Sequence, residues 1–352
     1  MDNVNIDPLN VHISQCSYQT MIGVGGVGTG TFFALNGNHT LGREESRSGH
    51  FIDRKDYCKL HIVSHYVKAL LGPEFKVIPV GKVGDDPTGG ELCREMQEAG
   101  LELGCMERTG EYSTLFSFCF IYPDGSGGNL TTDNSASSVV DAAYVQEAEE
   151  AFIQYRSKGI ALAVPEVPLD ARITLLELGT RYGFFRAASF TSEEIERVKK
   201  SKIFEKVDLL ALNLDEAAAL SGINSESIAP GEVVAEAVRV LQDMTPDILL
   251  SVTGGKKGSW CWDGRKAYHT PAYKTRINST AGAGDAFLAG LIAGITAGLE
   301  LHHAHLLGSL VAGLAISSPH TINKEIDRAA LWEFCSVAKV KLPSQIKVLL
   351  SR

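Results

Sequence analysis

Short runs of apolar residues alternate along the chain with longer stretches in which apolar positions recur every three or four residues. Continuous runs are typical of buried strands, whereas the longer spacing is typical of amphipathic helices. Strands separated by single helices indicate βαβ units, so we expect an α/β fold with a mostly parallel sheet covered on both faces. The predicted strands are Met21–Val24, Lys76–Val80, Ile160–Val164, Val207–Leu212 and Ile248–Val252. The predicted helices are Gly89–Ala99, Asp141–Tyr155, Leu169–Tyr182, Ser192–Lys200, Gly231–Gln242, Asp285–Gly298 and His303–Ser317.

Two segments break this alternation. Residues 28–56 are polar and glycine-rich without helical spacing, and Tyr112–Tyr122 is an aromatic stretch of alternating polarity. The turn residues Pro123-Asp124-Gly125 follow it, which is typical of a β-hairpin. We therefore expect a small antiparallel β lid formed by residues 28–56 and 112–132. The remaining residues, 1–27, 57–111 and 133–352, are expected to form the α/β core.

The composition is that of an ordinary globular protein, with 44% hydrophobic and 21% charged residues among 352. No apolar run reaches the ~18 residues that span a membrane, and the first twenty residues lack the pattern of a secretory signal. A net charge of −9 disfavours a nucleic-acid-binding protein. The cysteines, at positions 16, 58, 93, 105, 119, 261 and 335, form no C-x-x-C pair. This scatter indicates reduced thiols in a cytoplasmic protein rather than disulfides or a zinc site.

The most informative segment is Ser279–Phe287, in which small residues run directly into a predicted helix. Without bulky side chains, the backbone N–H groups near Gly282, Ala283 and Gly284 can converge at the helix N-terminus and hold a phosphoryl group. Asp285 beside them can accept the proton of an attacking hydroxyl. The alternative is a glycine turn in which Asp285 only interacts with the helix dipole.

Three further motifs have both a chemical and a structural interpretation. Gly81-Lys82-Val83-Gly84-Asp85-Asp86 precedes Pro87, where Asp86 can simply cap a helix. Asn213 and Glu216 have the spacing of a capping box. Thr253–Gly258 has the residues of a hairpin turn.

In this order, the four motifs resemble those of the ribokinase/PfkB family of carbohydrate and nucleoside kinases. The resemblance implies a three-layer α/β/α fold with a β lid, and ATP-dependent phosphorylation of a hydroxyl on a sugar, sugar acid, polyol or nucleoside. It also implies roles for individual residues. Asp285 would be the catalytic base, and the backbone of Gly282, Ala283 and Gly284 the anion hole. Nucleotide-site residues would be Thr253, Gly255 and Gly258, with Asn213 and Glu216 holding Mg²⁺ near the phosphates.

The segments that would select the substrate differ from the family pattern. The segment Gly23–Gly30 contains no acid, although the family usually places an aspartate there, and Ser279 replaces another family aspartate. We therefore expect Gly25 and Gly26 to form a neutral floor, with Arg47 and Arg54 among the nearby cations. This arrangement predicts a substrate bulkier or more anionic than free ribose.

Two alternative functions remain. Gly23, Gly25 and Gly28 match the fingerprint of a Rossmann NAD-dependent oxidoreductase. A ligand-binding or regulatory protein could also retain a kinase scaffold without turnover. A homodimer through the lid is the candidate assembly. The glycines 290, 294 and 298 suggest close helix packing, and His302, His303 and His305 suggest surface histidines rather than metal ligands.

Overall fold

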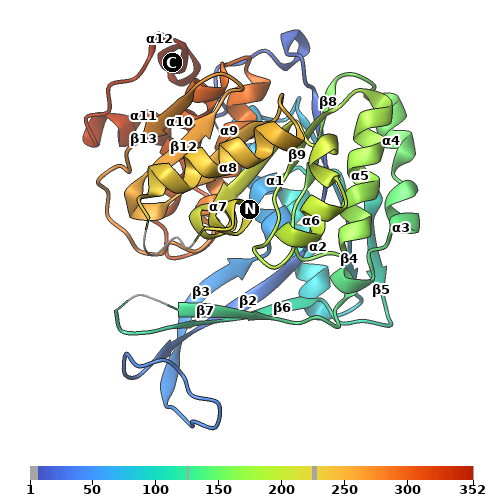
Figure 1. Ribbon diagram of the computed structural model, residues 1–352. Helices are drawn as coiled ribbons and strands as arrows, with labels where there is room; N and C mark the ends of the chain where they lie inside the picture. Colours follow the sequence, from blue (N-terminus) through green and yellow to red (C-terminus); the bar gives the residue numbers. More distant parts are fainter. Residues whose placement is uncertain (1–6, 125–126, 224–227, 352) are drawn as a thin grey trace.

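The computed structural model describes residues 7–124, 127–223 and 228–351. The core is a nine-stranded sheet with the strand order β13-β12-β11-β10-β9-β8-β1-β4-β5. Neighbouring strands from β11 to β5 are parallel, and β12 and β13 continue the sheet in antiparallel pairs. Helices cover both faces of this sheet (Figure 1), so the predicted three-layer α/β/α fold is confirmed.

The sheet strands are β1 (Thr20–Val24), β4 (Lys76–Gly84), β5 (Met106–Thr109), β8 (Gly159–Ala163), β9 (Phe185–Ala188), β10 (Leu209–Asn213), β11 (Leu249–Thr253), β12 (Ser259–Trp262) and β13 (Ala267–Thr270). The lid strands are β2 (Gly28–Leu35), β3 (Gly49–Tyr57), β6 (Leu115–Ile121) and β7 (Gly127–Thr131). The helices are α1 (Lys59–Leu71), α2 (Pro87–Glu98), α3 (Ala142–Gln146), α4 (Glu149–Gln154), α5 (Leu169–Tyr182), α6 (Ile195–Lys200), α7 (Leu214–Ser221), α8 (Pro230–Met244), α9 (Ala283–Thr296), α10 (Leu301–Ala315), α11 (Arg328–Val337) and α12 (Ser344–Leu350).

Two hydrophobic clusters lie on opposite faces of the sheet. Helices α1, α2 and α9 to α12 contribute to one cluster, and α3 to α8 contribute to the other. The strands have apolar side chains on both faces, which explains their continuous apolar runs. The predicted helix Asp141–Tyr155 is divided into α3 and α4, because the chain turns at buried Ala148.

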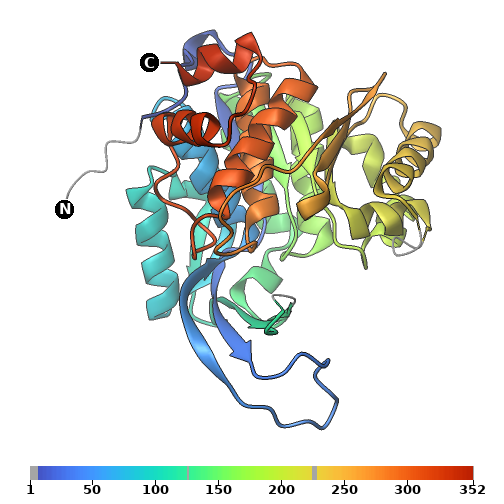
Figure 2. The ribbon, with the colours of Figure 1, turned by 90° about the vertical axis from the view of Figure 1, so that its left-hand side faces the viewer.

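The lid is a four-stranded sheet in the order β3-β2-β6-β7. The predicted β lid is confirmed, and the hairpin predicted after Tyr112–Tyr122 is the β6–β7 pair. Residues 28–56, predicted only as part of the lid, form the β2–β3 hairpin, and the two hairpins join through a parallel β2–β6 pair that was not expected. Figure 2 shows the β2–β3 hairpin running far out from the core. The predicted turn at 123–125 ends at Gly125, which lies outside the described residues. Within the described ranges, no helix has the length and apolar character needed to cross a membrane.

Candidate active site

The predicted catalytic residues lie at the carboxyl ends of the sheet strands. Strand β1 pairs with β4 on one side and with β8 on the other, so the order in which strands join the sheet reverses at β1. In open α/β sheets, ligands bind at such switch points beyond the strand ends. The segments after β1, β8 and β10 and the N-terminus of α9 therefore supply the candidate site.

The glycine segment before α9 forms a turn that leaves backbone amides available. Gly282 is the N-cap residue and has φ 74°, a left-handed conformation that favours glycine. A β-carbon there would also lie 2.8 Å from the carbonyl oxygen of Thr321. The amide of Ala283 donates to the Thr280 carbonyl at 3.2 Å. Within the described chain, the amides of Gly284 and Asp285 have no protein acceptor, and a β-carbon at Gly284 would have open space before it. This arrangement suits an oxyanion or phosphoryl group.

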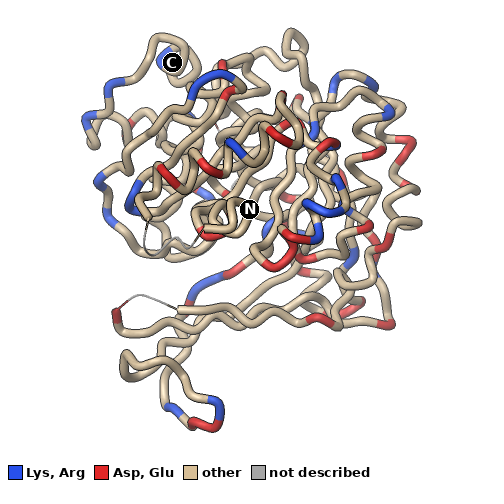
Figure 3. Tube along the Cα trace, in the orientation of Figure 1, with Lys and Arg blue, Asp and Glu red and all other residues tan. Residues whose placement is uncertain are grey.

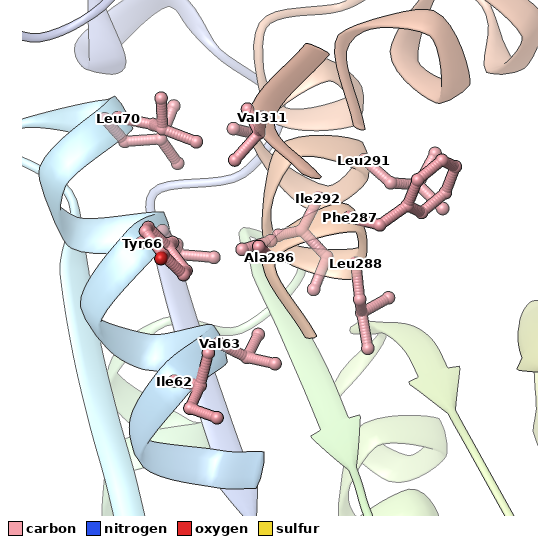
Figure 4. Close-up of a cluster of buried hydrophobic side chains, with 14 of the residues drawn as sticks. Ile62, Val63, Tyr66, Leu70, Ala286, Phe287, Leu288, Leu291, Ile292 and Val311 are labelled. Carbon is pink, nitrogen blue, oxygen red and sulfur yellow. The ribbon is translucent and has the colours of Figure 1, made fainter. Parts of the chain in front are cut away.

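Asp285 lies opposite Lys59, the first residue of α1. The Lys59 Nζ atom is 3.6 Å from the Asp285 Oδ1 atom, and the two side chains are 37% and 16% exposed. Burial raises the pKa of Asp285, and the Lys59 charge opposes that rise. Figure 4 shows apolar side chains of α1 packed against those of α9, including Val63, Tyr66 and Ile292. This packing fixes the positions of the two helices that carry the ion pair.

Glu166 follows β8 and is a third charged residue of this site. Its φ of 77° lies in the left-handed region, which costs a non-glycine residue about 1–2 kcal/mol. The Glu166 Oε2 atom accepts a hydrogen bond from the Lys59 backbone N–H at 3.2 Å. Burial raises the pKa of Glu166 to about 7, and the charges and amide of Lys59 oppose that rise. Strained, buried ionisable residues gather at functional sites.

The glycine run after β1 has a packing role, which disfavours the Rossmann alternative and corrects the expectation of a neutral floor. The chain continues from Gly25 into strand β2 instead of a helix, so the Rossmann fingerprint lacks its helix. The floor is also not neutral. A β-carbon at Gly26 would collide with the Glu166 carboxylate, and one at Gly30 with that of Asp56. Both carboxylates come from segments distant in sequence, which is why the local glycine pattern does not reveal them.

Carbonyl groups of the same glycine run accept hydrogen bonds from backbone amides at the N-terminus of α1. The carbonyl of Gly28 accepts from the Cys58 amide at 3.1 Å, and that of Gly26 accepts from the Leu60 amide at 3.3 Å. A β-carbon at Gly25 would collide with Val164. The glycines are therefore explained by close backbone approach. A substrate contact by Gly25 or Gly26 stays a prediction.

Asn213 and Glu216 form the capping box of α7. The Asn213 Oδ1 atom accepts from the Glu216 amide at 2.9 Å, and Glu216 Oε2 accepts from the Asn213 amide at 2.8 Å. Burial raises the pKa of Glu216, the Asn213 amide and the Lys59 charge oppose that rise, and the negative charge of Asp285 adds to it. Carboxylate and amide oxygens are the donor set that Mg²⁺ prefers. The residues therefore fit a magnesium ion as well as a helix cap.

Thr253, Gly255 and Gly258 lie at the turn between β11 and β12. The Gly254 amide donates to the Gly258 carbonyl at 2.8 Å, and both Gly255 and Gly258 have positive φ. The hairpin interpretation is therefore confirmed. Thr253 ends β11 directly beside Asn213 at the end of β10. The nucleotide contact stays a prediction at this edge of the sheet.

The two predicted arginines lie on the lid. Arg47 is in the loop between β2 and β3, at the lid end away from the core (Figure 1), where it bonds Glu45 and the His39 carbonyl. This position does not support its predicted contact with substrate, because its guanidinium stabilises the loop itself. Arg54 lies on β3 two residues before Asp56, in the stretch where the β2–β3 register is irregular. Its guanidinium is 5.9 Å from the centre of the Phe32 ring.

The other patterns have structural explanations. Gly290 meets the Cα atom of Gly308, and Gly294 meets that of Ala304, which confirms close packing of α9 on α10. The expectation of a surface histidine is wrong for His305, which is buried and pairs with Ser251. His302 and His303 instead lie near the carboxylate of Glu300. Asp86 caps α2 through the Gly89 amide.

Lys59, Glu166 and Asp56 were not found from the sequence. Glu166 follows the predicted strand Ile160–Val164 by two residues, and an acid at the carboxyl end of a buried strand is a usable signal. Lys59 and Asp56 belong to no motif. Only the fold brings them to Asp285.

A model of the pfkB family carbohydrate kinases matches residues 64–328 of the chain. The chain is 24% identical over 275 residues to 5-dehydro-2-deoxygluconokinase 2 of Bacillus cereus, covering 74% of this chain and 80% of that protein. It is 26% identical over 259 residues to ATP-dependent ribose-1-phosphate kinase of Halopiger xanaduensis, covering 70% and 77%. Ribokinase from Cryptococcus neoformans var. grubii serotype A, solved in complex with ADP, has a similar fold. Its TM-score is 0.71 at 18% identity, covering 90% of this chain and 99% of that one.

Proposed function

The chain belongs to the pfkB family of carbohydrate kinases and is a phosphotransferase, and from this premise we propose its reaction. The protein transfers the γ-phosphoryl group of ATP to a hydroxyl of a sugar, sugar acid, polyol or nucleoside. The single observation that supports this best is Asp285 beside the available amides at the N-terminus of α9. The name of the Halopiger relative and the ADP in the fungal ribokinase support ATP as the donor.

Each part of the site has a task in this reaction. Asp285 accepts the proton of the attacking hydroxyl, because its carboxylate is largely shielded from solvent and stands beside the available amides of Gly284 and Asp285 itself. These amides and the dipole of α9 stabilise charge on the phosphoryl group. Thr253, Gly255 and Gly258 line the nucleotide site at the ends of β10 and β11.

Mg²⁺ is the expected metal. Asn213 and Glu216 would hold it through their oxygens or through its bound waters. When bound, Mg²⁺ neutralises charge on the phosphates and orients them.

The substrate side of the site offers carboxylates as hydroxyl acceptors. Glu166 lies against Gly26, and Asp56 lies against Gly30 at the core end of the lid strands β2 and β3. Burial raises the pKa of Asp56 as it does that of Glu166. A protonated carboxyl can donate and an ionised one can accept, so the pair suits neighbouring hydroxyls of a carbohydrate or polyol. Arg54, two residues before Asp56 on β3, is the candidate contact for a substrate anion.

The proposed function is tested by ADP release. Purified protein with ATP and Mg²⁺ should release ADP with at least one acceptor from a panel of sugars, sugar acids, polyols and nucleosides, and ribose should not be the best. The product should carry one added phosphate by mass spectrometry. A folded protein that binds ATP but phosphorylates no acceptor would contradict the proposal.

We also propose that the lid forms a homodimer. Strands β2, β6 and β7 contain no charged residue (Figure 3). One face bears Phe33, Phe51 and Phe118 in mutual ring contact, with Phe51 66% exposed. Leu130 pairs with Phe118 and is 63% exposed. Exposed apolar faces of this kind mark interaction sites. Light scattering should give twice the monomer mass, and Phe51→Asp should give the monomer.

The seven unpaired cysteines support a reducing compartment for this reaction. We propose the cytoplasm, which fractionation of cells expressing the protein can test.

A further inference from the structure

Lys59 lies among the carboxylates of the active site but belongs to none of the motifs. Its ammonium is 3.6 Å from Asp285 Oδ1, and the negative charges of Glu166 and Glu216 also raise its pKa. These three acids come from α9, from the segment after β8 and from α7, so the ammonium lies within electrostatic range of three elements. The family match starts at residue 64 and therefore does not include Lys59.

The position of this ammonium is fixed by the backbone on which it stands. The Lys59 amide donates to Glu166 Oε2, and the amides on either side donate to Gly28 and Gly26. The packing of α1 on α9 in Figure 4 holds the helix relative to Asp285. The side chain is 37% exposed, so it reaches solvent rather than ending in the apolar core.

The reaction needs a cation at this point. An ionised Asp285 repels the phosphoryl group that has to approach it, and Glu166 and Glu216 add to that repulsion. A single ammonium beside Asp285 reduces the repulsion. With only a small displacement, the same ammonium can also stabilise the negative charge that develops on the phosphoryl oxygens during transfer.

We propose that Lys59 is a catalytic residue whose ammonium bridges Asp285 and the transferred phosphoryl group. This inference rests on the proposed kinase function and assigns a further residue to its site. In the free protein the ammonium pairs with Asp285, and in the complex with both reactants it also donates to a γ-phosphoryl oxygen. The surrounding acids keep Lys59 protonated, because their charges raise its pKa.

The transfer step balances without a proton from Lys59. The acceptor oxygen forms a bond to the γ-phosphorus, and its proton goes to a carboxylate oxygen of Asp285. The bond from the γ-phosphorus to the β,γ-bridging oxygen breaks, and ADP leaves with that electron pair. Lys59 begins and ends the step as an ammonium ion and contributes charge and orientation only.

The test compares Lys59→Met with Lys59→Arg on the best acceptor of the wild type. We expect kcat to fall at least ~10²-fold in Lys59→Met, as when one charge-stabilising donor is removed. Lys59→Arg keeps the charge and should retain kcat within ~10-fold. The ATP Kd should change only a few-fold in both.

A pH profile separates catalysis from simple support of the fold. The titratable groups of the described residues that face Lys59 and Asp285 are Glu166, Glu216, Asp56, the Cys58 thiol and the Tyr66 hydroxyl. Lys59 lowers the pKa of Asp285, so Lys59→Met should move the acid limb of kcat/KM to higher pH. Lys59→Arg should leave this limb in place.

Lys55→Met is the matched control. Lys55 is exposed and pairs with Glu95, outside the group of acids around Asp285, so its kinetics should equal those of wild type. A folded Lys59→Met with kcat within threefold and an unmoved acid limb overturns the role of Lys59. A wild type without ADP release on any acceptor overturns the proposed function instead, so the two failures are distinguishable.

Discussion

Gly284→Ala is the substitution that best separates the anion hole from an ordinary helix start. Gly284 is the second residue of α9, and its added β-carbon has no neighbour within 4 Å. Alanine is favoured over glycine in helices by about 0.5–1 kcal/mol, so the free energy of unfolding should stay equal or rise by that amount. The β-carbon of a helical residue points toward the N-terminus, which is where a phosphoryl group must approach the amides. A displacement of about 1 Å there costs ~10²-fold in rate.

The assay combines thermal melting with ADP release on one preparation. Gly284→Ala should melt at or slightly above the wild-type temperature and lose about two orders of magnitude in kcat. Gly290→Ala, in the same helix, is the control. Its β-carbon would lie 2.8 Å from Val311 and 2.9 Å from Gly308, so overpacking should cost about 1–3 kcal/mol while the folded protein keeps its kcat. A stable Gly284→Ala with kcat within threefold of wild type would refute the anion-hole assignment.

Three further predictions concern the carboxylates. Asp285→Asn should cut kcat by at least ~10² while the ATP Kd, measured by titration calorimetry, changes only a few-fold. Glu216→Gln should raise the Mg²⁺ concentration for half-maximal rate by about tenfold, yet keep the melting temperature, since its amide oxygen can still accept from Asn213; an unmoved Mg²⁺ titration would leave only the helix cap. Glu166 has a pKa raised to about 7, so its contribution to stability is fully present below the ordinary value near 4.5 and is lost as the pH rises through 7. The melting temperature of Glu166→Gln relative to wild type should therefore increase between pH 5 and pH 8, and a constant difference would contradict the raised pKa.

The core of the fold could be predicted because its signals are local. Each predicted strand run overlaps an observed strand, and α5 has the predicted bounds Leu169–Tyr182. Continuous apolar runs between helices leave few alternatives to a parallel sheet. The helix α1 is not among the helices predicted from the sequence. Almost all of its residues are buried, including the polar residues His61, Ser64 and His65, so its sequence lacks the alternation of apolar and polar faces that marks an amphipathic helix.

The candidate site also has one part that could be predicted from a local motif and one part that only the fold brings together. The residues of the proposed anion hole and Asp285 are contiguous in sequence, so the chain shows them as one motif. The proposed substrate side combines Asp56 and Lys59, which are three residues apart, with Glu166, and both stretches are distant from α9 in sequence. Gly26 and Gly30 are the only trace of Glu166 and Asp56 in the glycine segment, because each glycine leaves room for one of these carboxylates. A glycine run without an acid therefore indicates where a neighbouring side chain enters, and it does not indicate a neutral pocket.

Two features of the candidate site are expected to lower the stability of the folded protein. Glu166 combines a left-handed backbone with a carboxylate whose charged form is disfavoured, and burial likewise raises the pKa of Asp285. Neither feature strengthens the fold, so packing of α1 against α9 must hold the residues in place. Removing these charges should accordingly raise the melting temperature or leave it unchanged while turnover falls. At Gly290, where the same helix only packs, stability should fall and turnover should persist. Opposite responses at the two kinds of position are what a site strained for catalysis predicts, and parallel losses at both would indicate that the carboxylates serve the fold.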